Sequence, residues 1–362
     1  MATAGNVTRV NREVLRRINR EVSMRAARFA NAILSGVFRA IFRVEKAYEA
    51  AEPEVYQLEY ETDRILWARL DAWHMNNMAV AIANEDVLAS RYHLFTEYDF
   101  VIIADISQSM MLNWWPVYGE RLDEDMSKRP LPKWRVPGDQ TKLFFLKYTL
   151  CSFLHAARIN DFISQVLLVG GGKIQQRDSR TEPNLEEILL VDIDRHCRAM
   201  AEMRGPEPTR LQDALRRVAA RRRRAIVLCI SDFTDALRYP TEAEPRVPLR
   251  EILLPLAEIS AEHQVLVLHI MDRLEIAPQI ELIKLMAKDC PYTNPECHPQ
   301  QKPLGNVSPE SLVEFRQRAE TFCLDLHNGL AQFGVKYEQI VSGRDDEQVD
   351  KRIYQLGEAT GA

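Results

Sequence analysis

The sequence predicts an α/β fold: a doubly wound, mainly parallel central sheet flanked by helices, with a helical and mixed N-terminal extension. Two observations carry this prediction. Short, continuously apolar runs, typical of strands buried on both faces, alternate with longer segments whose apolar residues recur at helical spacing. Strands that alternate with helices form βαβ units, and these units build parallel sheets of the Rossmann type.

The expected elements follow one another from residue 100 to residue 341. The strands are the apolar runs at residues 100–104, 162–169, 225–230, 265–270 and 335–341. The helices between them cover residues 142–157, 211–221, 249–263 and 309–333. The last helix has its own start signal, because Ser308 suits the N-cap and Pro309 suits the first helical position.

These elements divide the chain into three parts. Residues 1–95 form the helical and mixed N-terminal region, and residues 96–345 form the α/β domain. Two long loops, at residues 112–140 and 278–307, interrupt that domain, and loops of this length are usually functional or disordered. Residues 346–362 are expected to form a polar tail.

Composition limits the classes of partner. A formal net charge of −5 argues against nucleic acid. Residues 1–43, however, hold nine Arg and two Glu, which indicates either a solvated helix face or a contact with an acidic partner or an anionic membrane surface. No transmembrane segment is expected, because Arg39 and Arg43 interrupt the apolar stretch 29–44. Six scattered cysteines and no secretory signal favour free thiols in a reducing cytoplasm.

Five oxygen-bearing residues stand where the ends of strands and the start of a helix are expected. Asp105, Ser107 and Ser109 follow the strand at 100–104, Asp232 follows the strand at 225–230, and Thr209 opens the helix at 211–221. In a parallel sheet the carboxyl ends of the strands share one edge, where ligands bind. Two neighbouring carboxylates need a proton or a cation between them. Hydroxyl and carboxylate oxygens suit Mg²⁺, or Mn²⁺, better than zinc.

Each piece also has a structural interpretation. Ser107 or Ser109 would cap a helix, Thr209 with Gln212 forms a capping box, and Asp232 would begin a turn. The metal interpretation therefore depends on the joint occurrence of these residues, in this order, at the ends of strands.

This pattern resembles the metal-ion-dependent adhesion site of von Willebrand factor A domains. The resemblance implies that Asp105, Ser107, Ser109, Thr209 and Asp232 hold a divalent ion directly or through water. It also implies that an acidic residue of a protein partner completes the coordination.

Residues 55–345 further resemble the family called domain of unknown function 58, although Glu61 and Thr62 replace the usual Pro-Gly-Asp-Asp run. The matching segments are Tyr60-x-x-Asp63-Arg64-x-x-Trp67, Asn160-Asp161, Ile230-Ser-Asp-Phe233 and Met271-Asp272-Arg-Leu-Glu275. Members of that family are thought to work with MoxR-type AAA+ ATPases as metal-dependent adaptors or chaperone-like factors. The resemblance implies such a partner here.

Other residues stand near the expected site. Trp114, Trp115 and Trp134 lie in the loop at 112–140, where they form either a partner-binding rim or buried anchors of the loop. Asp272 and Glu275 are expected near the same edge in a supporting or structural role.

Three functions remain open. The first is a cytoplasmic, Mg²⁺-dependent protein-binding module. The second is an enzyme of metal-assisted phosphoryl transfer with Asp105 as nucleophile or base, as in haloacid-dehalogenase-like phosphatases. Those enzymes need a second Asp where this chain has Ser107, and no lysine-bearing motif completes such a site. The third is a metal-free scaffold of the same fold.

Overall fold

The computed structural model describes the chain in segments. These are residues 12–31, 55–56, 87–88, 99–107, 109–111, 141–159, 162–202, 211–221, 225–233, 249–276, 309–342 and 348–358. The chain divides into two compact units, one of residues 1–38 with 98–359 and one of residues 39–97 with 360–362. The second unit contains a short antiparallel pair, β1 (Val55–Tyr56) and β2 (Val87–Leu88).

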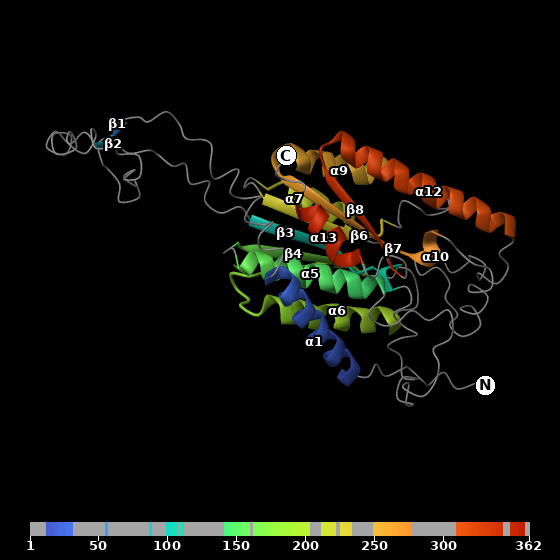
Figure 1. The fold of residues 1–362 in the computed structure, drawn as a ribbon, viewed down its shortest axis with the longest axis horizontal. Coiled ribbons are helices and arrows are strands. Elements are labelled where there is room, and N and C mark those ends of the chain that lie inside the picture. The colour runs from blue at the N-terminus through green and yellow to red at the C-terminus, as the bar shows by residue number, and fades with distance from the viewer. Residues whose placement is uncertain are drawn as a thin grey trace. The chain divides into compact units, whose positions relative to one another are not determined.

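The first unit is built on a six-stranded, mostly parallel sheet (Figure 1). In spatial order its strands are β5 (Lys173–Asp178), β4 (Ser164–Gly170), β3 (Asp99–Asp105), β6 (Ala225–Ser231), β7 (Gln264–Asp272) and β8 (Lys336–Ser342). Every neighbouring pair is parallel except β4 and β5. The α/β class and the mainly parallel, helix-flanked sheet predicted from the sequence are therefore confirmed.

Strand order places a topological switch point between β3 and β6. From β3 the chain adds β4 and then β5 on one side, and it returns to add β6, β7 and β8 on the other. Ligands of open α/β sheets bind outside the carboxyl ends of the strands at such a point. Both strands are buried along their whole length, which explains their continuously apolar sequences.

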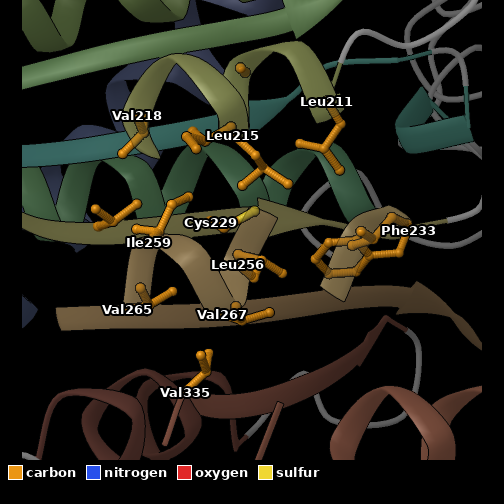
Figure 2. Packing of buried hydrophobic residues seen from close by; sticks show 14 of the residues in the cluster. Leu211, Leu215, Val218, Cys229, Phe233, Leu256, Ile259, Val265, Val267 and Val335 are labelled. Atoms are coloured by element: carbon orange, nitrogen blue, oxygen red, sulfur yellow. The ribbon is translucent and has the colours of Figure 1, made fainter. Parts of the chain in front are cut away.

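Helices cover both faces of the sheet (Figure 1). One face carries α5 (Lys142–Ile159), α6 (Leu185–Glu202) and α13 (Val349–Glu358). The other carries α7 (Leu211–Ala219), α9 (Leu249–Glu262) and α12 (Pro309–Gln332). Figure 2 shows the core on this second face, where Leu215 of α7 and Leu256 of α9 pack over Cys229 and Val267 of the sheet.

The N-terminal helix α1 (Arg12–Phe29) packs against α5 although the chain places it in the region before the α/β domain. Val22, Ala26 and Phe29 are buried, while the arginines of its opposite side are exposed: Arg16, Arg17, Arg20 and Arg28. Helix α1 thus uses its apolar side for packing and presents arginines at the surface.

A buried polar network joins α1 to α5 and α6. Lys147 Nζ donates to Asp194 Oδ1 at 2.5 Å and to Asn19 Oδ1 at 3.0 Å. Asn19 Nδ2 in turn donates to Asp194 Oδ2 at 2.6 Å. Each charged group has its counterpart within the network, which is the condition for burying ions at tolerable cost.

Three elements were not expected from the sequence. Strand β5 is polar and lies at the edge of the sheet, and it is reached through a two-residue turn in which Gly171 and Gly172 both have positive φ, of 56° and 65°. Two successive positive φ values suit a type I′ hairpin. Helix α6 connects β5 to the rest of the sheet. Helix α13 lies within the segment 346–362 that was expected to be a polar tail, because Val349, Ile353 and Leu356 are buried along one side.

Some expected features lie outside the described residues. These are the remainder of the N-terminal helical pattern after residue 31 and the loops at 112–140 and 278–307. Among the helices that the structure describes, none combines the length and the apolar character needed to cross a lipid bilayer.

Replacing Lys147 by Met tests the buried network. We expect the free energy of unfolding to fall by about 3–5 kcal/mol, because the buried Asp194 carboxylate loses its ammonium partner. Denaturant titration of the full chain measures this loss, with Lys173→Met on the exposed start of β5 as the control. A loss below about 1 kcal/mol, as for an ordinary surface substitution, would contradict the role of the network.

Candidate functional site

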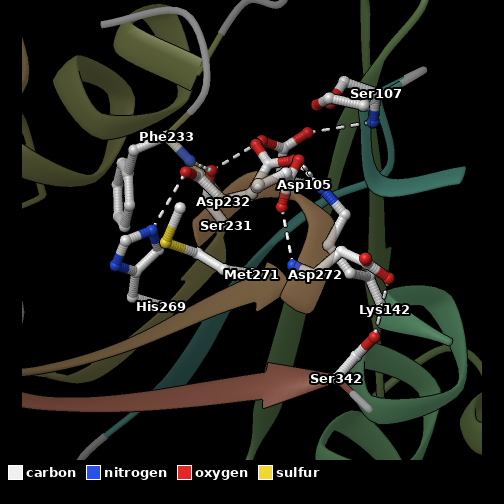
Figure 3. A network of polar contacts seen from close by, with 12 residues as sticks. Asp105, Ser107, Lys142, Ser231, Asp232, Phe233, His269, Met271, Asp272 and Ser342 are labelled. Atoms are coloured by element: carbon white, nitrogen blue, oxygen red, sulfur yellow. Dashed lines mark hydrogen bonds and ion pairs between the residues drawn. The ribbon is translucent and has the colours of Figure 1, made fainter. Parts of the chain in front are cut away.

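The candidate site lies at the carboxyl ends of β3 and β6. Asp105 is the last residue of β3, and Asp232 directly follows Ser231, the last residue of β6. The two strands are hydrogen-bonded neighbours, with Ala104 opposite Ile230. The predicted convergence of the two aspartates at one edge of the sheet is therefore what the strand order produces. Figure 3 shows the polar contacts around them.

Asp105 is held by donors from both strands. Its Oδ1 accepts a hydrogen bond from the Ser107 amide at 2.9 Å, and its Oδ2 accepts one from the Ser231 hydroxyl at 2.6 Å. The side chain is 3% exposed, so these donors replace water as its hydrogen-bonding partners. The carboxylate is fixed in position relative to β6 before any ligand arrives.

Ser107 and Ser109 lie beside Asp105 with their hydroxyls facing one another. Their Oγ atoms are 2.9 Å apart, and both residues are buried. Ser109 begins η3 (Ser109–Met111), a short 3₁₀ turn. The Asp-x-Ser-x-Ser spacing thus brings two hydroxyls together in the turn that directly follows Asp105.

Gly170 lets the chain after β3 take this path. The Ile106 amide donates to the Val169 carbonyl at 2.8 Å, which draws the chain over the end of β4. A Cβ atom on Gly170 would lie 2.7 Å from the Ile106 carbonyl oxygen, closer than real Cβ atoms approach. A larger residue at position 170 would push away the segment that carries Ser107.

Asp232 is paired with a lysine that the sequence analysis did not identify. Lys142 is the first residue of α5, and its ammonium donates to Asp232 Oδ2 and to Glu275 Oε1, both at 2.7 Å. Thr141 caps the helix, since its Oγ1 accepts from the Phe144 amide at 3.2 Å. The sequence analysis placed no lysine at this edge, whereas the structure places Lys142 there.

Lys142 is fully buried, yet it remains charged. Burial alone would lower the pKa of Lys142, but the carboxylates of Asp232 and Glu275 outweigh burial and raise that pKa above its ordinary value. The raised pKa favours the charged ammonium form of Lys142 within the site. The ammonium lies where two carboxylates would otherwise repel one another.

Glu275 and Asp272 complete the acidic side of the site, near the edge where the sequence placed them. Glu275 belongs to the short helix α10 (Arg273–Ile276), and its Oε2 accepts from the Asp272 amide at 2.6 Å. Asp272 Oδ2 accepts from the Ser342 hydroxyl at 3.0 Å, which ties β7 to β8. Burial raises the pKa of Glu275 to about 7; Lys142 opposes this rise, and the Asp232 and Asp272 carboxylates add to it.

The turn after β6 is strained and held from two sides. Phe233 has a φ of 50°, which is unfavourable for a residue with a side chain. Its amide donates to the Ser231 hydroxyl at 2.9 Å, so Ser231 joins this turn to Asp105. The His269 ring Nε2 donates to the Asp232 carbonyl at 3.1 Å.

These contacts define the state of His269. Because a carbonyl only accepts, Nε2 carries the hydrogen, and Nδ1 then accepts from the Tyr337 hydroxyl at 2.7 Å. Burial lowers the pKa of His269 to about 4, so the ring is neutral near pH 7. His269 therefore acts as a neutral brace that positions the Asp232 backbone.

The described oxygens fit one corner of a divalent-cation site. The Ser107 and Ser109 Oγ atoms are 2.9 Å apart and share a hydrogen bond. Two ligands at right angles around Mg²⁺, each at about 2.1 Å, are about 3.0 Å apart, so the same spacing is compatible with neighbouring ligands of the ion. Among the described residues no three His, Cys, Asp or Glu side chains group to hold a metal, so the hydroxyls are essential to this fit.

Only some of the expected metal ligands lie among the described residues. Asp105, Ser107, Ser109 and Asp232 are brought to one edge of the sheet, with Asp232 engaged by Lys142. Thr209 and the proposed rim residues Trp114, Trp115 and Trp134 lie outside the described residues. The sequence analysis did not assign a role to Ser231, although Ser231 directly precedes Asp232 in the predicted motif.

The comparisons with known proteins add no relative from which a role could be transferred: no family model, no curated protein and no solved structure matches the chain.

The pKa of His269 predicts a pH-dependent contribution to stability. The unfolded-state pKa is near 6.5 and the folded-state pKa is about 4, so the unfolded chain binds the proton first. This contribution is complete above pH 6.5 and is lost as the pH falls toward 4. Compared with His269→Gln, the wild type should lose roughly 2–3 kcal/mol of unfolding free energy between pH 7.5 and pH 4.

The unfolding free energy of the wild type is compared with that of His269→Gln at each pH because Glu275 also affects the pH dependence. Its raised pKa makes stability fall as the pH rises over a similar range, opposite to the effect of His269. Urea titrations at several pH values measure the difference between the two proteins, and His327→Gln, which changes an exposed imidazole on α12, is the control. A difference between wild type and His269→Gln that does not change with pH would contradict a neutral, buried His269.

Proposed function

We propose that this chain is a metal-ion-dependent protein-binding module with a von Willebrand factor A-like domain. One observation carries the proposal: Asp105, Ser107 and Ser109 lie at the switch point of a mostly parallel sheet, and the hydrogen-bonded Ser107 and Ser109 hydroxyl oxygens have a spacing that neighbouring ligands of Mg²⁺ also have. The ion is Mg²⁺ or Mn²⁺. Ser107 and Ser109 ligate it, Asp105 binds it directly or through water, and Thr209 is a further ligand.

The partner follows from the chemistry of the ion. A divalent cation held by neutral hydroxyls and one or two carboxylates keeps a preference for additional anionic oxygen. A carboxylate of a protein partner would supply it. By the resemblance to the domain of unknown function 58 family, the partner is a MoxR-type AAA+ ATPase, and the chain acts as its adaptor or as a chaperone-like factor in the cytoplasm.

The contacts of Lys142 favour a second candidate function, that of a metal-free scaffold. The Lys142 ammonium already neutralises part of the acidic edge, since it contacts both Asp232 and Glu275 at 2.7 Å. A site with a built-in cation keeps its geometry when no metal is bound. The phosphoryl-transfer hypothesis has less support, because Lys142 is engaged with two carboxylates and Ser107 stands where the second Asp of such enzymes is needed.

Mn²⁺ titration followed by thermal unfolding tests the proposal. A ligand that binds the native state alone stabilises it, by about 2.7 kcal/mol at 100 times its Kd. We expect the wild-type midpoint to rise with Mn²⁺ or Mg²⁺ and the Asp105→Ala midpoint to stay unchanged. The control is Asp325→Ala, which removes an exposed carboxylate from α12.

Equal responses of the wild type and Asp105→Ala would mean that the metal binds elsewhere. No response of the wild type would favour the scaffold. Turnover of a generic phosphate ester that Asp105→Ala abolishes would instead establish the enzyme. For the partner, retention of a MoxR-type ATPase by the immobilised chain should require the divalent ion and disappear with a chelator.

A further inference from the structure

We infer that Lys142 sets the metal affinity of this site by acting as a resident cation on Asp232 and Glu275, which a divalent ion would otherwise bind. The inference rests on the proposed metal-dependent function and adds a residue that controls it. Three features of the structure support it: the position of Lys142, the way its partners are held, and the neutral donors that contact Asp105.

The position of Lys142 is specified by the fold. Lys142 begins α5 directly after its cap Thr141, and the helix is buried along nearly its whole length, so its N-terminus is fixed against the edge of the sheet. The side chain of Lys142 is 0% exposed. A buried lysine is costly unless its charge is paired, and the two short contacts to carboxylates provide that pairing.

The partners of Lys142 come from separate strands and share its charge. Asp232 follows β6 and Glu275 lies just after β7, so the ammonium bridges two neighbouring strand ends. Figure 3 shows Lys142 extending toward the cluster of acidic side chains at the strand ends, near Asp105 and Asp232. The second oxygen of Glu275 is bound to the Asp272 amide, so Glu275 is held in this orientation.

Asp105 is anchored differently. Two of the contacts that hold it come from the Ser107 amide and the Ser231 hydroxyl, both neutral donors. The edge is thus divided into an Asp105 half with hydroxyls and an Asp232 half that contains a lysine. A divalent ion near both halves is repelled by the ammonium and competes with it for Asp232. Lys142 therefore weakens metal binding while it holds the apo site together.

Lys142→Met removes the resident cation and tests the inference. We expect Mn²⁺ to bind this variant at least about tenfold more tightly than it binds the wild type, because Asp232 becomes available and the repulsion is gone. Isothermal titration calorimetry on the full chain, with electron paramagnetic resonance of free Mn²⁺, measures the affinity. In the double variant Lys142→Met with Asp232→Asn the gain should disappear.

Lys147→Met is the matched control. It removes a second buried, carboxylate-bound lysine from the same helix, outside the site. Its Mn²⁺ affinity should equal that of the wild type, so a gain in both variants would reflect loss of charge or looser packing and would overturn the inference. If Lys142→Met folds poorly, Lys142→Met with Glu275→Gln removes one charge of each sign and should still bind Mn²⁺ more tightly than the wild type, through the Asp232 carboxylate.

The outcomes separate the two proposals. Wild-type binding that is unchanged in Lys142→Met overturns the role of Lys142 and leaves the metal-dependent function standing. Binding by Lys142→Met alone supports the inference and overturns metal dependence in the wild type, in favour of the scaffold. Absence of binding by both proteins overturns both.

Discussion

The edge of the sheet depends on the ion pairs of Lys142. Parallel strands bring their carboxyl ends together, and in this chain those ends carry Asp105, Asp232 and Asp272, followed by Glu275. Buried carboxylates so close together are unstable unless positive charge or hydrogen-bond donors balance them. The Lys142 ammonium, two serine hydroxyls and backbone amides provide that balance. The protein's own side chains and backbone amides thus hold the acidic edge together without a bound ligand.

The strain at Phe233 belongs to the same arrangement. Its left-handed backbone turns the chain sharply after β6, and Ser231 and His269 hold that turn from opposite sides. Ser231 also holds Asp105, so the positions of the two aspartates are mechanically linked through one hydroxyl. Unfavourable backbone at the end of a central strand is more common at functional sites than elsewhere. Here it coincides with the place where a doubly wound sheet binds ligands.

The parts of the fold and site that could be predicted from the sequence are those whose signal lies within one short segment of the chain. The apolar runs of β3 and β6 are local signals, so both strands and their terminal aspartates could be predicted. Lys142 could not, because its partners lie 90 and 133 residues away and a lysine at the start of a helix normally faces solvent. Strand β5 has no apolar pattern, since it is a polar edge strand. Helix α13 has a recognisable apolar spacing, but Tyr148 and the sheet that receive it are distant in sequence.

The most direct test is a crystal structure grown with Mn²⁺ and measured at the manganese absorption edge. The account predicts one anomalous peak within ligand distance of the Ser107 and Ser109 hydroxyls and beside Asp105, with the Lys142 ammonium still on Glu275. A map without a peak at saturating Mn²⁺, or with a peak remote from Asp105, would contradict the assignment of this edge as a metal site.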